Sequence, residues 1–359
     1  MEIKEVNKIN EVNEIEDINT RIITFDNKRK VYLTIFMGLI LFVTFIGAIC
    51  MGAYSIPPQD VFKEIASVFG IGARGETASS TIIWNIRMTR IILGIAVGIA
   101  LSSSGAVYQG VFRNPLIEPY ILGVCSGAAF GSALAIMFKF PFSLQFLSFI
   151  FGLIAVFLTY SFARVDNQTP LVTLILSGVI IGSLFSAMVS IFQYISSEEQ
   201  LRRLMFWLMG GLYNATWADI RIVVPIILTG FTIIWCYSWK LNILSMGEQE
   251  AKVLGINVER TKIILMVVST VITSIAVSVA GIIGWVGLMI PHAARMMVGP
   301  DHRYLLPVTA ILGATFMVVC DTIARTITTG EVPIGIVTAI VGAPYLLFML
   351  RKRKNYFGG

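Results

Sequence analysis

Charged side chains inside apolar segments are the residues of this sequence best suited to do chemistry, and there are few of them. Asp321 and Arg325 stand four residues apart near the end of an apolar run, so they can pair on one helix face or turn outward. Glu118 follows Pro115 in a break between two apolar runs. An ion-coupled carrier needs buried acids or unwound ion sites. This scarcity counts against an ion-coupled secondary transporter, which remains the alternative of a different class.

The sequence holds none of the familiar catalytic or nucleotide-binding motifs. A GxxxxGK[ST] phosphate loop, an HExxH pair and a GxSxG nucleophile are all absent. The four cysteines lie in four different apolar runs, without a CxxC and without a histidine at ligand spacing. We therefore expect no catalytic residue, no metal and no cofactor on this chain. If the chain transports a solute actively, the energy must come from another polypeptide.

The composition is that of a membrane protein. Of the 359 residues, 56% are hydrophobic and only 13% are charged, whereas soluble domains carry about 25% charged residues. A bilayer core about 30 Å thick needs roughly 20 apolar residues per helix, and the apolar runs leave room for about ten. They are too long and continuous for the alternating strands of a membrane barrel. We predict an all-α polytopic membrane protein of the cell membrane.

The chain divides into a polar amino-terminal tail at 1–27 and a transmembrane domain at 28–359. A short amphipathic piece at Pro57–Phe69 and an interfacial segment at Ser196–Asp219 lie between spans. The predicted spans are Val31–Ala53, Arg90–Val111, Ile121–Phe138, Phe142–Phe162, Leu171–Ile195, Ile220–Trp239, Ile263–Ala280, Ile282–Met297, Leu305–Ile323 and Ile334–Leu350.

An even number of crossings places both termini on one side of the membrane. The loops grouped with the termini carry more Lys and Arg than the loops on the other face, so both termini are predicted to be cytoplasmic. The net charge of +6 thus reflects orientation in a bilayer and gives no reason to expect a nucleic-acid partner.

The polar segment 241–262 falls on the same cytoplasmic side. Within it, Glu248–Gly255 can form a short helix with Gly247 and Gly255 as natural breaks. Its apolar residues, which could dock on a soluble partner, are Met246, Val253, Leu254 and Ile256. A solvated loop between two spans is the alternative.

Small residues recur every four positions in two spans, which predicts close helix packing in the middle of the bundle. The stripes are Gly94, Gly98, Ser102, Ala106 and Gly110, and then Gly123, Gly127, Gly131 and Ala135. Lining a translocation path is an additional interpretation of the same stripes. Three Gly and Pro positions also recur 176 to 177 residues later, which falls short of establishing an internal repeat.

Several long motifs, in order, resemble the FecCD-type permeases of ABC importers, including the cobalamin permease. They are the run RMTRIILGIAVGIALSSSGAVYQGVFRNPLIEPYILGVCSGAAFG, then FWLMGGLYNATW, GEQEAKVLGINVERTK, GIIGWVGLMIPHAARMMVGPDHRYLLPVTAILGA, DTIART and EVPIGIVTAIVGAPYLLFML. The resemblance covers Val31–Leu350 and leaves the amino-terminal tail outside.

The resemblance implies a set of partners. Members of the family pair with a second copy of themselves or a close paralogue. Two cytoplasmic ATPase subunits hold ATP and Mg, and an extracytoplasmic binding protein delivers the substrate. It further implies ATP-driven alternating access, with iron-siderophore chelates as the expected cargo and cobalamin or haem as alternatives.

The resemblance also implies roles for individual residues. Those matching the ATPase-coupling helix are Gly247, Glu248, Glu250, Ala251, Leu254 and Gly255. Those matching positions that dock the binding protein are Arg87, Arg90 and Arg325. A cytoplasmic gate is implied at Asn114, Pro115 and Leu116, and a second gating loop near Thr169–Thr173, of which we single out Thr173.

Overall fold

The computed structural model describes residues 27–357 except 53, 55, 69–76, 139–142, 165–168 and 329. The predicted tail at 1–27 lies outside the described residues apart from Asn27. The elements, in chain order, are a first helix Asn27–Cys50, α2 (Pro58–Val68), α3 (Ala78–Thr81), η1 (Ile82–Met88), α4 (Thr89–Val111), η2 (Pro119–Leu122), α5 (Val124–Phe138), α6 (Leu144–Ala163), α7 (Leu171–Ile195), α8 (Glu198–Met209), α9 (Trp217–Cys236), α10 (Ser238–Met246), α11 (Glu248–Val253), α12 (Val258–Ala280), α13 (Val286–Val298), α14 (His302–Ala324) and α15 (Ile334–Phe357).

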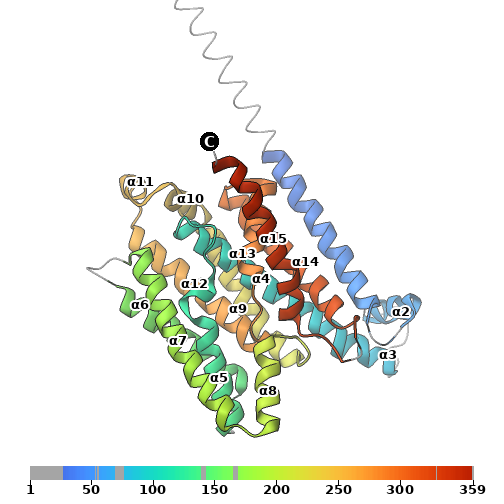
Figure 1. Cartoon of the computed structure of the whole chain (residues 1–359). Coiled ribbons are helices and arrows are strands. Elements are labelled where there is room, and N and C mark those ends of the chain that lie inside the picture. The colour runs from blue at the N-terminus through green and yellow to red at the C-terminus, as the bar shows by residue number, and fades with distance from the viewer. Residues whose placement is uncertain are drawn as a thin grey trace, which may run out of the picture.

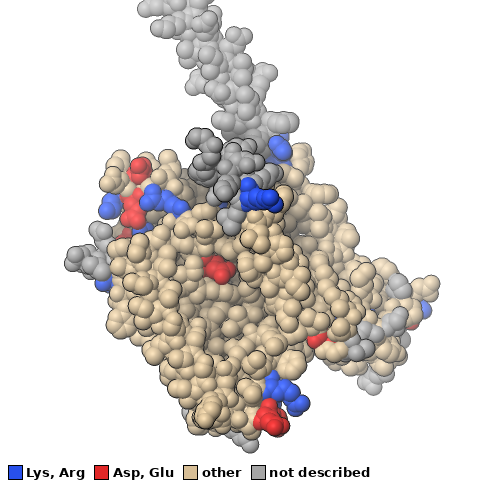
Figure 2. Space-filling view, viewed as in Figure 1, with Lys and Arg blue, Asp and Glu red and all other residues tan. Residues whose placement is uncertain are grey.

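The all-α membrane fold is confirmed. Seven of the described helices are long and apolar enough to cross a membrane, and three shorter apolar helices, α5, α13 and the apolar part of α15, complete the set. The part of the chain that the structure describes contains no strand. Figure 2 shows charged side chains gathered towards the two ends of the bundle, with a wide uncharged surface between them and one acidic group in a hollow.

Helix α4 forms the centre of the bundle. Most of its residues are buried, and α14, α12, α13 and α9 pack around it. The small residues predicted to allow close packing do so: a Cβ on Gly98 would overlap the backbone of Gly313 in α14, and one on Gly105 would overlap the carbonyl of Gly287 in α13. The second stripe acts in the same way, with Gly131 of α5 against Leu147 of α6.

Several helix boundaries differ from the predicted spans for local backbone reasons. The second span begins at Ala78 rather than Arg90, because Thr77 caps a helix that continues through η1 into α4. The third begins at Val124, because Gly123 has a left-handed φ of 79°. The eighth begins at Val286 rather than Ile282, since positive φ angles at Gly281 and Trp285 interrupt the helix.

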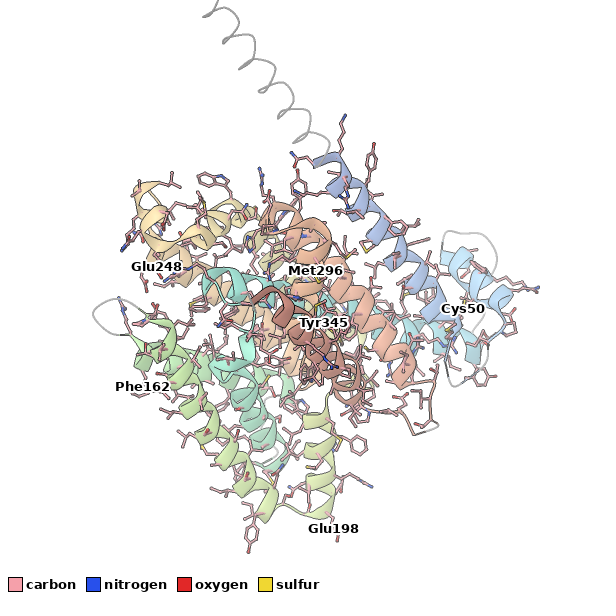
Figure 3. The ribbon with its side chains drawn as sticks, turned by 45° about the horizontal axis from the view of Figure 1, so that its top comes forward. Cys50, Phe162, Glu198, Glu248, Met296 and Tyr345 are labelled. Atoms are coloured by element: carbon pink, nitrogen blue, oxygen red, sulfur yellow. The ribbon has the colours of Figure 1, made fainter. Side chains whose placement is uncertain are left out.

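The two ends of the bundle carry different elements. Figure 1 shows α10, α11, the carboxyl terminus and the start of the first helix at one end, and α2, α3 and α8 towards the other. Figure 3 shows Glu248 of α11 and Glu198 of α8 at opposite ends of the bundle. The predicted coupling segment and both ends of the transmembrane domain therefore share one side of the molecule.

Candidate coupling and gating site

The segment around α11 has the helical shape that the sequence predicts. Helix α10 ends at Met246, Gly247 separates it from α11, and a left-handed φ of 76° at Gly255 turns the chain back towards α12. Met246, Val253 and Leu254 are 68%, 87% and 57% exposed. Met246 ends α10, and Val253 and Leu254 end α11, so exposed apolar side chains flank this short helix, and docking on a soluble partner stays a prediction.

Two contacts fix α11 to the bundle. The Glu248 carboxylate pairs with Lys262 of α12 at 2.5 Å, and Ala251 is fully buried beneath the helix. Ile256, which the sequence predicts on the docking side, instead turns into the core and is 9% exposed. The apolar docking surface is therefore narrower than predicted and comprises Met246, Val253 and Leu254. Glu250 lies in the same helix, and a Cβ on Gly247 would overlap its carboxylate.

Helix α10 forms the arm that carries α11, and hydrogen bonds fasten it to two central helices. The Asn242 side chain donates to Asp301 Oδ1 at 2.7 Å and accepts from the backbone N–H and ring Nδ1 of His302, both at 2.8 Å. Ser245 Oγ donates mainly to the carbonyl of Leu241 within α10, at 2.8 Å, and reaches the carbonyl of Gly110 only at 3.4 Å. The arm is thereby tied to the start of α14 and the end of α4.

Hydrogen bonds at this junction stabilise the ionised form of the Asp301 carboxyl. Burial alone would raise the pKa of its carboxyl, but hydrogen bonds from Arg303 and Asn242 outweigh burial and lower the pKa to about 2. The side chain also caps α14 by accepting from the backbone N–H of Arg303 at 3.0 Å. Asp301 therefore stays ionised at neutral pH.

The first predicted gate is a tight turn after α4. Asn114 Oδ1 accepts from the backbone N–H of Leu116 at 3.0 Å, and Arg113 adopts a positive φ of 51°. This turn passes through Pro115 and leaves Leu116 55% exposed. Two residues further on, burial raises the pKa of Glu118 to about 7. Within the described chain its carboxyl makes no hydrogen bond and no ion pair.

The second predicted gating residue, Thr173, lies in the first turn of α7. Its hydroxyl donates to the carbonyl of Ala163 at the end of α6, at 3.1 Å, and to that of Pro170 at 2.8 Å. Among the described residues, no hydrogen bond joins Thr173 to the Asn114 turn. The structure thus places the two gate predictions on separate connections, and their roles stay predictions.

Sequence reasoning missed Glu259 as a functional candidate. Its Oε1 accepts from the hydroxyls of Tyr160 and Thr169, both at 3.3 Å. These donors belong to α6 and to the connection that leads into α7. Glu259 lies within the run GEQEAKVLGINVERTK, but neither that run nor local spacing indicates a contact with Tyr160 or Thr169, because those residues come from distant positions in the chain.

The three predicted docking arginines lie together, in a buried cluster at the opposite end of the bundle. Arg90 pairs with Asp321 and Glu331, each at 2.8 Å, and Arg325 Nε lies 3.4 Å from Asp321. Arg87 donates to backbone carbonyls at the end of the first helix, including Ile49 at 2.5 Å, and Arg325 donates to Ala48.

Burial and pairing decide what these arginines do in the isolated chain. Arg87, Arg90 and Arg325 are 2%, 4% and 4% exposed. Asp321 pairs with both Arg90 and Arg325. Of the two possibilities left open by the sequence, pairing with Asp321 or turning outward, Arg325 therefore shows the internal pair. Docking of a binding protein by these residues stays a prediction. In the structure, the three arginines join the first helix, α4 and α14.

A bundle of long apolar helices with charged side chains gathered at its two ends defines a polytopic membrane protein. The sequence pattern of the FecCD transport family matches residues 39–352, and the chain belongs to that family.

Three relatives extend the match. A cobalamin import system permease protein from Halobacterium salinarum is 46% identical over 84% of this chain and 78% of its own length. A molybdate import system permease protein from Haemophilus influenzae is 40% identical over 89% of this chain and 95% of its own length. A solved structure described as an inward-facing conformation of a putative metal-chelate type ABC transporter is 37% identical, with a TM-score of 0.80, covering 89% and 99% of the two chains. This chain is accordingly a permease of an ABC importer and not an enzyme.

Proposed function

We propose that this permease passes metal chelates of the iron-siderophore type into the cell. The single observation that carries the choice of metal chelates is the similarity to a solved metal-chelate type transporter over nearly the whole of both chains. The exposed helix α11 supports an energy source outside the chain, because it offers an apolar surface at the end of a fastened arm.

The mechanism that we propose is alternating access driven through α11. ATP binding closes the ATPase pair, α11 moves with the surface that it contacts, and the connections near Asn114–Leu116 and Thr173 open or close a path. Each ligand shifts this equilibrium only by its difference in affinity for the two states. Specificity for the cargo then lies mainly in the binding protein.

Cobalamin is a second candidate cargo, and haem remains an alternative. The Halobacterium relative, named for cobalamin import, is 46% identical to this chain. The Haemophilus relative, named for molybdate import, is 40% identical. These relatives carry names for different cargoes, so each of those cargoes must be included in the binding test.

The partners and orientation complete the proposal. A second copy of this chain, or a close paralogue, forms the other half of the path. Two cytoplasmic ATPase subunits hold ATP and Mg, an extracytoplasmic binding protein delivers cargo, and this chain binds no cofactor. Both termini and 241–262 face the cytoplasm, which fits the shared location of α11 and the ends of the transmembrane domain.

The cargo is tested on the binding protein that co-purifies with the permease. Its intrinsic fluorescence is titrated with a ferric siderophore, haem, cobalamin and molybdate in parallel. We expect quenching at the lowest concentration with the ferric siderophore. Tighter binding of cobalamin or haem would select that alternative, and a preference for molybdate would contradict the metal-chelate proposal.

A further inference from the structure

The base of α11 is joined to α12 by a short, half-buried ion pair. Glu248 lies at the first position of α11, and Lys262 lies in the second turn of α12, where its side chain is only 7% exposed. An ion pair with one partner withdrawn from water is screened less than a surface pair. The pair therefore links the start of α11 directly to the first turns of α12.

One residue of the same helical turn joins α12 to a different part of the bundle. Glu259 precedes Lys262 by three positions, so the two side chains project from neighbouring points on the helix surface. A single oxygen of Glu259 accepts from both Tyr160, in the last turns of α6, and Thr169, which is 5% exposed. Both oxygen-to-oxygen distances are 3.3 Å, longer than the roughly 2.5–2.7 Å of strong hydroxyl-to-carboxylate bonds, so these two contacts are loose in this state and have room to shorten.

Thr169 lies two residues before α7, and Thr173 ties the first turn of α7 to the end of α6. Helix α7 packs on α5, α6 and η2, and only 28% of its apolar stretch is buried in the isolated chain. The contact between Glu259 and Thr169 therefore joins α12 to the segment that leads directly into the packed amino-terminal end of α7.

We propose that Glu259 is a positioning residue that transmits the movement of α11 through α12 to the beginning of α7, a proposal that rests on α11 being the ATPase contact. Glu248–Lys262 forms the first link, and Glu259 with Tyr160 and Thr169 forms the second. The arm α10, bonded to the start of α14 through Asn242 and packed on α4, gives α11 a fixed point about which to move.

The test follows α7 directly and needs no identified cargo. All four native cysteines are replaced by serine, Val172→Cys is added as a reporter because Val172 is 75% exposed beside Thr173, and the permease is purified with its ATPase in proteoliposomes. The rate of maleimide labelling is measured without nucleotide and with ATP and vanadate. We expect Glu259→Ala to reduce the nucleotide-induced change in rate about tenfold, within the range typical of coupling between sites, while phosphate release from ATP continues.

Matched variants separate transmission from simple support of the fold. Glu259→Gln keeps the accepting oxygen and should retain most of the response, and Tyr160→Phe with Thr169→Val should lose as much as Glu259→Ala. Adding these two changes to Glu259→Ala should cause no further loss. Asp60→Ala, which removes an exposed acid of α2, is the control and should respond like the parent.

The two proposals fail in different ways. If the parent protein binds no ATPase or shows no nucleotide response, α11 is not the coupling element and the proposed function falls. If the parent responds and Glu259→Ala responds equally, the function stands and the transmission through Glu259 is overturned.

Discussion

At the scale of single residues, the buried ion pairs around Asp321 are expected to contribute to the stability of the bundle. One carboxylate is shared by Arg90 and Arg325, and all three side chains are nearly inaccessible. Removing one partner of a buried ion pair leaves an uncompensated charge. Because Arg87 and Arg325 also hold the end of the first helix, loss of the cluster should loosen that helix too.

We expect Asp321→Ala to lower the free energy of unfolding by about 3–5 kcal/mol, the typical cost of breaking a buried pair. The measurement is thermal or denaturant unfolding in detergent. Asp60→Ala is the control, since Asp60 makes only an exposed pair with Lys63 at 3.7 Å and should change stability by less than about 1 kcal/mol. Equal stability of the two variants would show that the cluster contributes nothing.

Glu118 gives a prediction with a pH dependence. Burial raises its pKa to about 7 from an ordinary value of 4.5, so between these pH values the folded protein keeps a proton that the unfolded chain has lost. Stability therefore declines as pH rises from about 4.5 to 7. Glu118→Gln should be more stable than the parent at pH 8, by up to about 3 kcal/mol, and equal to it at pH 4. An unfolding midpoint shifted equally at both pH values would contradict this.

At the scale of elements, the contact between α4 and α13 depends on glycine at both sides. We expect Gly105→Ala to destabilise the protein, because the added Cβ would overlap the carbonyl of Gly287 and force the helices apart. Gly38→Ala in the first helix meets nothing within 4 Å and should be neutral or stabilising, by about 0.5–1 kcal/mol. The midpoint of thermal unfolding separates the two, and similar effects would contradict this packing.

For helix α11, the prediction concerns association with the ATPase. Glu250→Ala combined with Leu254→Ala should weaken association with the ATPase and reduce stimulated ATP hydrolysis several-fold, because α11 would lose exposed groups of its docking surface. Co-purification and phosphate release measure the two effects. The control changes Glu198 and Met205 of α8, exposed at the other end of the bundle, and should leave association intact. Unchanged association in the α11 variant would remove the coupling assignment.

At the scale of the whole molecule, hydropathy alone is enough to predict the all-α class and the positions of the apolar helices, seven of which are long enough to span a membrane. Apolar length and small-residue spacing depend on local sequence, which is why the α4 and α5 stripes and the glycine breaks around α11 could be predicted. Helix starts shifted where a backbone angle decides, as at Gly123 and Trp285.

Contacts between distant residues could not be predicted in this way. The exposure of an arginine depends on what lies opposite it in space, and Asp321 and Glu331 lie more than two hundred residues from Arg90. Tyr160, Thr169 and Glu259 meet only because α6, α7 and α12 share one end of the bundle. Local sequence does not indicate contacts between distant residues, so the Asp321 cluster and the Glu259 contact became visible only in the three-dimensional structure.

The measurement that tests most directly whether this chain is an ATP-driven permease is cargo uptake into liposomes that contain the permease, its ATPase and its binding protein. The cargo is whichever compound quenches the binding protein, and no ion gradient is imposed. We expect uptake only with hydrolysable ATP, and its loss with a non-hydrolysable analogue. Uptake driven by a proton or sodium gradient without ATP would contradict the assignment and favour an ion-coupled carrier.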